Sequence, residues 1–521
     1  MAVVVFIPSL WAGYLADDNV MLRTISVLRL PWQAFTHTDI ATIRSHPYRP
    51  IWVLYNALLK TISSSAVLHH AGNLALFAGS CVLVIVIAQR IVDMRVAYIA
   101  GLAFAVYPRH GESVAWIAGS TDLLAGFLVL LAVGLLTSRG APRWATNLGV
   151  VVGVLAPLAK ESGFVIPALA TVVLLATWQN DDEIVRHRRV VSLAVLAVGV
   201  VFDLVIRTAV LHGTGNDVTE PFGVHRLVTV LGSQIIATVT SSRMLVLVHP
   251  SLFFIAAAIV ALLLVGVVQI FRSRDVARRR LLFVGVAWYV ISLLPIYNNA
   301  VALNNSNGER LLFLPSVGLI FVIAAAVSPL VLRNWGRVVV TLAMVGLGTV
   351  SVLEASDYAT AGTISQRVVA ETVQLAHRDS TIVLLNIPDS YRGSRLLGAG
   401  FAQAVARAGR RDVTVLVCAP SIIESLAPQR VTFVAQGAPG VIVASSSSSL
   451  PFETPSSGRQ IQSTGCTYQP ATSGRIAPGL YQKVNLTLTA TSGPTQYLWF
   501  NGVDVKECTL SVCSGILNKT H

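Results

Sequence analysis

Two adjacent carboxylates, Asp17 and Asp18, directly follow an apolar stretch over residues 1–14. Charged side chains beside a membrane are costly unless they are paired or used in function. One carboxylate here could take the proton of a hydroxyl group as a general base, or the two could hold a divalent cation. An acidic cap on a helix over residues 19–29 would explain the same pair without any chemistry. Both interpretations stay open from these residues alone.

A second polar group surrounds Arg49, within the run from His46 to Pro50. The planar guanidinium of Arg49 could hold a phosphate group, or it could anchor the chain at the membrane interface. Further polar side chains follow in the next apolar segments, at Asn56, His69, His70 and Asn73. The histidines lack the spacing typical of zinc ligands, so they are weak evidence for a metal.

Two compact motifs bring both signs of charge together. The first runs from Tyr107 to Trp116, includes Glu112, and is followed by Asp122. A solvated turn whose charges pair locally is the alternative interpretation of this motif.

Lys160 and Glu161 form the second motif, and they lie between two apolar segments with no polar loop around them. The alternative is that these two side chains pair with each other. Neighbouring residues on a helix point to different faces, so we expect at least one of them to find a partner elsewhere.

Two single arginines lie near the predicted outer ends of apolar segments. Arg310 could neutralise an anionic lipid head group, or its long side chain could simply reach the interface. Arg207 stands on the side of the membrane where basic residues are otherwise rare. Either an anionic ligand or a structural partner such as Asp217 would explain it.

Composition indicates a polytopic membrane protein. The chain has 521 residues, of which 54% are hydrophobic and 12% charged, whereas soluble domains carry about 25% charged residues. Apolar runs recur at lengths that cross a membrane as helices. We therefore expect an all-α bundle of about eleven transmembrane helices, over residues 1–14, 66–88, 95–108, 121–137, 145–159, 162–178, 190–211, 251–271, 280–297, 311–332 and 337–354.

Arginine placement predicts the orientation of this bundle. Every second short loop between the predicted spans carries arginines, so these loops all lie on one side of the membrane, which places them and the N-terminus in the cytoplasm. The net charge of +13 is then topological, and no basic stretch alternates with aromatic residues as in a nucleic-acid-binding protein. The long loops 15–65 and 212–250, and every candidate residue above, fall on the exterior face.

The chain changes character after residue 355, where the predicted membrane domain 1–355 ends. We expect an exterior α/β domain over residues 356–444, a Ser/Pro-rich linker over 445–479 and a small β-rich segment over 480–521. The four late cysteines, Cys418, Cys466, Cys508 and Cys513, would then face an oxidising compartment that permits a disulfide. Cys508 with Cys513 or Cys466 is the natural pairing, although sequence alone does not decide it.

Several motifs occur together in an order that resembles a known enzyme family. They are Tyr48-Arg49-Pro50 with Asn56 and His70-x-x-Asn73, Tyr107-Pro108 through Glu112 to Trp116 and Asp122-Leu123-Leu124, Lys160-Glu161-Ser162-Gly163, and Glu309-Arg310 through Leu314-Pro315-Ser316. The set resembles the GT-C glycosyltransferases, and above all the membrane region of the transmembrane O-mannosyltransferases with tetratricopeptide repeats and their bacterial relatives. The chain departs from that pattern at Thr121, where the family often has Arg, at Leu311, where Tyr is usual, and in the tail that replaces the repeats.

The resemblance implies an inverting transfer of a sugar, such as mannose, from a polyprenyl-phosphate donor to an acceptor hydroxyl of a protein or glycan. It implies a site at the outer face of a plasma membrane, among membrane lipids and without nucleic acid. Asp17 or Asp18 would be the base, and a divalent cation is optional because some members work without one. Arg310, Lys160 and Arg49, with Arg207 behind them, would contact phosphate, while Glu112, Asp122 and Glu161 would orient substrates or those cations.

Other classes of membrane protein remain as alternatives. A transporter or flippase would need polar residues at the middle of the membrane, whereas the charges here gather at one face. A polysaccharide ligase or polymerase would use a lipid-diphosphate donor and a late outer loop rich in Arg and His, which the loop 212–250 provides at His212, His225, Arg226, Arg243 and His249. A receptor would use the exterior tail as its binding module.

Overall fold

The computed structural model describes most of the chain up to residue 418 and separate strands beyond it. The described residues are 1–28, 30–36, 48–138, 140, 142–180, 182–211, 223–241, 266, 268, 270, 275–303, 305–386, 390–397, 400–418, 421–422, 429–435, 441–446, 452–453, 461–463, 466–470, 475–477, 480–481, 483–488, 494–501, 503–508 and 513–517. They form two compact units, the first made of residues 1–11 and 24–356, and the second of residues 12–23 and 357–521.

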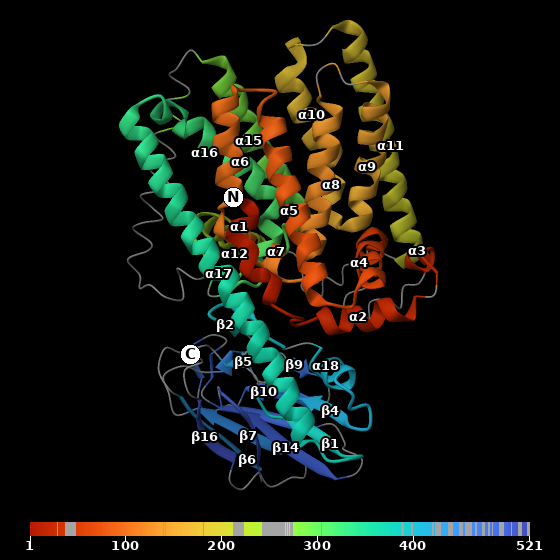
Figure 1. The fold of residues 1–521 in the computed structure, drawn as a ribbon, viewed down its shortest axis with the longest axis vertical. Coiled ribbons are helices and arrows are strands. Elements are labelled where there is room, and N and C mark those ends of the chain that lie inside the picture. Colours follow the sequence, from red (N-terminus) through yellow and green to blue (C-terminus); the bar gives the residue numbers. More distant parts are fainter. Residues whose placement is uncertain are drawn as a thin grey trace. The chain divides into compact units, whose positions relative to one another are not determined.

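The first unit is helical (Figure 1). Its helices are α1 (Ala2–Phe6), α3 (Gln33–Thr36), α4 (Pro50–Ile62), α5 (Ala66–Ala88), α6 (Met94–Ala105), α7 (Gly111–Ala115), α8 (Ser120–Leu136), α9 (Arg143–Ala159), α10 (Ile166–Thr177), α11 (Glu183–Leu211), α12 (Val224–Val239), α15 (Val276–Leu293) and α16 (Phe313–Val331). Two helices cross a unit boundary in the chain, namely the short α2 (Asp18–Val27) and the long α17 (Asn334–Leu375).

Local sequence explains where several of these helices begin. Ser65 accepts a hydrogen bond from the Val67 backbone N–H and caps α5, and Asp93 caps α6 in the same way. Such side chains satisfy backbone groups that lack a partner inside the helix. Pro50 opens α4, where its missing N–H costs nothing.

Five helices in the described part of the chain are long and apolar enough to cross a membrane: Ala66–Ala88, Glu183–Leu211, Val276–Ile296, Glu309–Val331 and Asn334–Leu375. A sixth crossing would combine Pro108–Ala115 with Ser120–Leu136, which meet at 106°. The protein is thus a mostly helical integral membrane protein, but the expected eleven spans are not confirmed.

Short helices account for much of the difference between the expected spans and those found. Several predicted spans are helices of 10–17 residues, among them Met94–Ala105, Arg143–Ala159 and Glu161–Thr177. Pro108 ends one of them, since the residue before a proline avoids the helical conformation. At Lys160 the backbone is extended, which separates α9 from the next helical turn. The predicted span 251–271 lies almost entirely outside the described residues.

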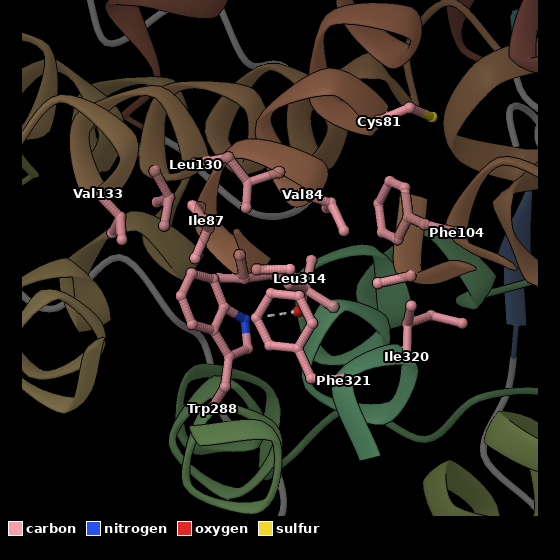
Figure 2. Close-up of a cluster of buried hydrophobic side chains, with 14 of the residues drawn as sticks. Cys81, Val84, Ile87, Phe104, Leu130, Val133, Trp288, Leu314, Ile320 and Phe321 are labelled. Carbon is pink, nitrogen blue, oxygen red and sulfur yellow. Dashed lines mark hydrogen bonds between the residues drawn. The ribbon is translucent and has the colours of Figure 1, made fainter. Parts of the chain in front are cut away.

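The first unit has an apolar core in which aromatic side chains lock two helices together (Figure 2). Trp288 of α15 is fully buried, and its indole N–H donates to the carbonyl oxygen of Leu314 in α16 over 3.0 Å. Its ring lies 6.3 Å from that of Phe321, nearly edge-on. A Cβ atom on Gly318 would lie 2.5 Å from the carbonyl oxygen of Gly285. Small residues at this crossing therefore let the two helices approach closely.

The second unit contains a small mixed sheet. Strands β1 (Thr381–Leu384), β4 (Thr414–Val417), β14 (Thr495–Phe500) and β15 (Val505–Cys508) pair in the order β15-β14-β1-β4, and β1 is parallel to both of its neighbours. Helix α18 (Phe401–Arg407) lies between β1 and β4 in the chain and packs Phe401 and Val405 into the core of this unit. Ser394 and Arg395, which precede this helix, pair with Ser390 and Tyr391 in a separate two-stranded sheet.

The remaining strands form two further sheets. A six-stranded sheet has the order β16-β6-β7-β13-β10-β9, and a four-stranded sheet has the order β11-β12-β8-β5. Their members are β5 (Ser421–Ile422), β6 (Gln429–Ala435), β7 (Val441–Ser446), β8 (Phe452–Glu453), β9 (Ile461–Ser463), β10 (Cys466–Pro470), β11 (Arg475–Ala477), β12 (Leu480–Tyr481), β13 (Lys483–Leu488) and β16 (Cys513–Leu517).

These sheets correct the expected linker at 445–479, because strands β8 to β11 lie inside it. Strand β13 lies inside the six-stranded sheet, where it pairs with β7 on one side and with β10 on the other. The predicted segments 356–444 and 480–521 also contribute to one sheet, because β1 from the first pairs with β14 from the second. Cys418 and Cys508 are both disulfide-bonded, whereas Cys81 is a buried free thiol.

Candidate active site

Seven of the residues predicted for the site lie in the helical unit, and they pair with one another over long distances in sequence. We call this group the cation cluster: Arg49, Lys160, Arg207 and Arg310 with the carboxylates Glu112, Asp122 and Glu161. It contains four cations against three carboxylates, so one positive charge remains in excess. Such an excess favours an anionic ligand.

Arg310 is held in place by several contacts with its neighbours. It follows Gly308, whose φ of 91° is a conformation that glycine adopts readily, and it lies in the short 3₁₀ helix Glu309–Leu312. Its Nη1 lies 2.5 Å from Oε1 of Glu112, and its backbone N–H donates to Oε2 of the same carboxylate over 2.9 Å. The guanidinium also lies 4.9 Å from the ring centre of Trp116. Glu112 is fully buried, whereas the Arg310 side chain keeps 24% of its surface exposed.

Asp122 links Arg310 to Lys160. The carboxylate lies in the first turn of α8, where the helix dipole favours a negative charge. It pairs with the Lys160 ammonium, and its Oδ2 lies 3.6 Å from Nε of Arg310. Lys160 lies between the apolar helices α9 and α10, and burial lowers the pKa of its ammonium to about 8, although Asp122 opposes this shift. The neighbouring Asp122 carboxylate therefore helps Lys160 to keep its positive charge.

Glu161 binds two arginines rather than its neighbour Lys160. Arg49 Nη2 lies 2.8 Å from Oε2 of Glu161, and Arg207 Nη2 lies 2.9 Å from Oε1. Arg207 also donates to the Tyr48 carbonyl oxygen over 3.3 Å and is almost fully buried, whereas Arg49 is 24% exposed. Lys160 and Glu161 thus point to different partners. Asp217, the other partner considered for Arg207, lies outside the described residues.

The structure adds a buried pair that the sequence interpretation did not place in the site. Arg109 Nη1 lies 2.6 Å from Oε1 of Glu309, and neither side chain is exposed by more than 1%. Arg109 also donates to the backbone and hydroxyl oxygens of Thr240, just after α12. The sequence contained a sign of this pairing. One motif carries Arg109 and Glu112, and the other carries Glu309 and Arg310, so each charge in the first motif has an opposite charge in the second. Arg109 lies in the 3₁₀ helix Pro108–His110 just before α7, so the two pairs together fasten α7 and this turn to the turn that carries Arg310.

Asp17 and Asp18 belong to the second unit, and the structure distinguishes them. Asp18 is fully buried, begins α2, and accepts a hydrogen bond from the Leu15 backbone N–H over 2.8 Å. Asp17 is only partly buried. The helix expected after these carboxylates is present and begins at Asp18. Asp17 directly precedes it, and the Asp17 carbonyl oxygen accepts from the Met21 N–H over 2.9 Å, which is the position of a helix cap.

No family model matches the chain. Over 180 residues it is 30% identical to "Protein O-mannosyl-transferase TMTC3" of Mus musculus, and 29% identical to the Homo sapiens protein of the same name. This chain is similar to a protein O-mannosyl-transferase. The resemblance predicted from the motifs is therefore confirmed, although the match covers 32% of this chain and 19% of the mouse relative.

Solved structures give a weaker likeness. ArnT from Cupriavidus metallidurans bound to undecaprenyl phosphate aligns over 80% of this chain and 88% of its own, with 13% identity and a TM-score of 0.43. The archaeal oligosaccharyltransferase AglB from Archaeoglobus fulgidus aligns over 79% of this chain and 63% of its own, with 11% identity and a TM-score of 0.40. Both TM-scores are below 0.5, so neither likeness establishes a function.

The other polar residues noted in the sequence support helix packing. Asn73 on α5 accepts a hydrogen bond from the Tyr55 hydroxyl and donates to the Val114 carbonyl oxygen next to Glu112. Asn56, His69 and His70 are buried as well. His46 lies outside the described residues, as do His212, Arg243 and His249. In the part of the chain that is described, no three histidine, cysteine or carboxylate side chains gather as metal ligands would.

Proposed function

We propose that this protein is a membrane glycosyltransferase that moves a sugar from a polyprenyl-phosphate donor to an acceptor hydroxyl at the outer membrane face. The similarity to a protein O-mannosyl-transferase supports mannose as the sugar and a protein hydroxyl as the acceptor. The observation that carries the proposal is the cation cluster, in which two partly exposed arginines are each fixed in place by a carboxylate, Arg310 by the buried Glu112 and Arg49 by Glu161.

The cluster suits the leaving group of such a reaction. When the bond between the anomeric carbon and the phosphate oxygen breaks, negative charge grows on the phosphate. Preorganised cations stabilise that charge without having to reorient during the reaction. Arg310 and Arg49 would contact the phosphate because they keep exposed surface. Lys160 and Arg207, which are more buried, would add positive potential from behind, and Glu112, Asp122 and Glu161 would hold the cations in place.

The oxygen of the acceptor hydroxyl attacks the anomeric carbon from the side opposite the departing phosphate, which inverts the configuration of that carbon. A carboxylate must take the proton of this hydroxyl during the attack. We assign this role to Asp17 rather than Asp18. The assignment is supported by burial, since Asp18 is fully buried and engaged with the Leu15 backbone, whereas Asp17 is partly exposed. A divalent cation at this pair stays an untested prediction.

Transfer from a defined donor tests the proposal. The purified protein would be incubated in lipid vesicles with polyprenyl-phosphate mannose and a hydroxyl-bearing acceptor peptide. We expect Asp17→Asn to abolish transfer, because the amide cannot accept the proton, while donor binding stays near the parental value. Parental transfer by Asp17→Asn would refute the assigned base. Transfer from lipid-diphosphate donors alone would favour a polysaccharide ligase or polymerase, and lipid movement without transfer would favour a flippase.

The proposed orientation needs a separate measurement. Cysteines would be introduced one at a time at the exposed positions Arg411 and Trp335 in a Cys81→Ser chain, and the labelling of that parent chain would be subtracted as background. An impermeant thiol reagent should label Arg411→Cys in intact cells and Trp335→Cys only after permeabilisation. The reverse pattern would place the C-terminal region in the cytoplasm and refute an exterior site.

A further inference from the structure

The segment that carries Asp17 is built into the second unit, although its neighbours on both sides in the chain belong to the first. We propose that the C-terminal region positions the catalytic carboxylate, with Gly362, Leu396, Gly400 and Arg407 as its positioning residues. The inference rests on the proposed function, and it assigns a role to residues 357–521. The carboxylate lies in the turn Leu15–Asp18, which we call the acidic turn.

The acidic turn has a strained backbone. Ala16 has a φ of 40°, a left-handed conformation that non-glycine residues adopt at a cost. The turn is closed in both directions, since Asp18 N–H donates to the Leu15 carbonyl oxygen over 2.9 Å and Leu15 N–H donates to the Asp18 carboxylate. Such strain persists only where surrounding contacts determine the conformation.

The chain around α18 supplies one set of these contacts. The Ala16 N–H donates to the Leu396 carbonyl oxygen over 2.9 Å. On the other side of the same residue, a Cβ atom on Gly400 would lie 2.5 Å from the Ala16 carbonyl oxygen. Glycine at position 400 is therefore required for the close approach as well as for its φ of 87°. The strained residue is held at both its N–H and its carbonyl group.

The segment just before the turn is held by α17 and α18. A Cβ atom on Gly362 would overlap the carbonyl oxygen of Ala12, so the backbone there lies directly against α17. The Arg407 guanidinium lies 4.2 Å from the ring centre of Tyr14, a distance typical of a cation–π contact. Tyr14 and Leu15 are both buried. Contacts from two helices thus fix the approach to the acidic turn.

This arrangement has a consequence for catalysis. A misplacement of about 1 Å can lower a rate by about 10²-fold, because the reacting groups must meet at close range. Asp17 lies directly after the strained Ala16, so a shift of the turn moves its carboxylate. Loosening the C-terminal contacts should therefore lower kcat, while the KM for the lipid donor, whose phosphate the cation cluster would bind, changes little.

Two glycine substitutions with matched controls test the inference in the full-length protein. Gly362→Ala forces the Ala12 backbone to move, whereas Gly346→Ala on the same helix meets nothing within 4 Å and gains the same helix propensity. Gly400→Ala collides with Ala16, whereas Gly409→Ala is equally left-handed, with a φ of 103°, and meets nothing within 4 Å. We expect each of the first variants to lose about 10²-fold in kcat relative to its control, with KM for polyprenyl-phosphate mannose within two- to three-fold.

Hydrogen exchange gives a readout that does not depend on activity. The backbone N–H groups of Leu15, Ala16 and Asp18 are all hydrogen-bonded, so they should exchange faster in Gly362→Ala and Gly400→Ala than in the two controls. Slow exchange and a control-like kcat in both variants would overturn the inference. If instead Asp17→Asn keeps full transfer while exchange quickens as expected, the assigned base is wrong and the positioning of the turn still stands.

A milder variant covers the case in which the glycine substitutions prevent folding. Arg407 is exposed, as is Arg411, so neither arginine is needed for the core. We expect Arg407→Gln to lower kcat about two- to five-fold through loss of its contact with Tyr14. Arg407→Lys should restore part of this loss, and Arg411→Gln should have no effect. Equal kcat for Arg407→Gln and Arg411→Gln would contradict the inference.

Discussion

The cation cluster and the acidic turn hold their charged groups by different physical means. In the cluster, side chains from well-separated segments pair with one another, and the carboxylates that orient the arginines are mostly buried. In the acidic turn, backbone hydrogen bonds and close backbone contacts at two glycines hold the segment that carries Asp17 and Asp18. The cluster should therefore respond to changes of charge, and the turn to changes of backbone shape.

The two pairs that fasten α7 to the Arg310 turn differ in exposure, and this difference separates stability from activity. Arg109 and Glu309 are both buried, so removing one leaves an uncompensated charge in a low-dielectric interior. Arg310 is partly exposed, and its partner Glu112 keeps a hydrogen bond from the Arg310 backbone. Substitution of Arg109 should thus damage the fold, whereas substitution of Arg310 should damage the chemistry.

The largest effect on stability should come from Arg109→Met. We expect a loss of about 3–5 kcal/mol in the free energy of unfolding, because Glu309 would stay buried without its partner. Thermal unfolding in detergent would measure it, with Arg143→Met at an exposed helix start as the control. The double variant Arg109→Met/Glu309→Leu should recover much of the loss. Equal destabilisation in the single and double variants would show that the charge left by Arg109→Met is not the cause.

Among the cations of the cluster, Arg310 should have the largest effect on transfer when it is replaced by Gln, at little cost to the fold. Removing one preorganised group that stabilises developing charge lowers kcat by about 10²–10³-fold. Arg278 is a matched control, because it is 21% exposed and pairs with Asp275 at 2.9 Å, outside the cluster. Steady-state kinetics with polyprenyl-phosphate mannose would compare the two. A similar kcat for Arg310→Gln and Arg278→Gln would remove Arg310 from the phosphate site.

Lys160 should make transfer sensitive to pH. Its pKa of about 8 means that the ammonium loses its proton as pH rises through that value, so kcat should fall about ten-fold for each further pH unit. Lys160→Arg should abolish this fall, because arginine stays charged.

Unfolding would not explain such a loss. Between about pH 8 and 10.4 the unfolded chain binds more protons at this lysine than the folded protein does, so its contribution to stability rises with pH. A parallel drop in Tm over this range would contradict the assignment to Lys160.

Particular residues show what the sequence could and could not reveal. The adjacency of Lys160 and Glu161 predicted separate partners, because side chains one residue apart cannot share a helix face. Arg109 and Glu309 were missed because each lies in a turn whose charges could have paired locally. The expected number of spans stays unconfirmed where apolar segments form helices of only 10–17 residues, as at Met94–Ala105 and Arg143–Ala159. Hydropathy alone does not give the length of the helix that an apolar segment forms.

The acidic turn lay beyond sequence analysis for a related reason. Asp17 and Asp18 looked equivalent, and no pattern indicated that Ala16 is left-handed or that residues near position 400 lie against it. Contacts of this kind depend on backbone positions that are far apart in the chain and carry no charge or hydropathy signal. Gly362 and Gly400 reveal them only because a Cβ atom would collide there.

The smallest effect should come from Ala16→Gly, which probes the strain itself. Glycine relieves a backbone cost of about 1–2 kcal/mol. It also gives up about 0.4–1 kcal/mol through a more flexible unfolded chain and about 0.8 kcal/mol from a buried methyl group. These contributions nearly cancel, so we expect the free energy of unfolding to change by less than about 1 kcal/mol. The turn would nevertheless be less restricted, and kcat should fall by a few-fold while the donor KM is unchanged. A rise in kcat would mean that the strain opposes the productive position of Asp17 rather than holding it there.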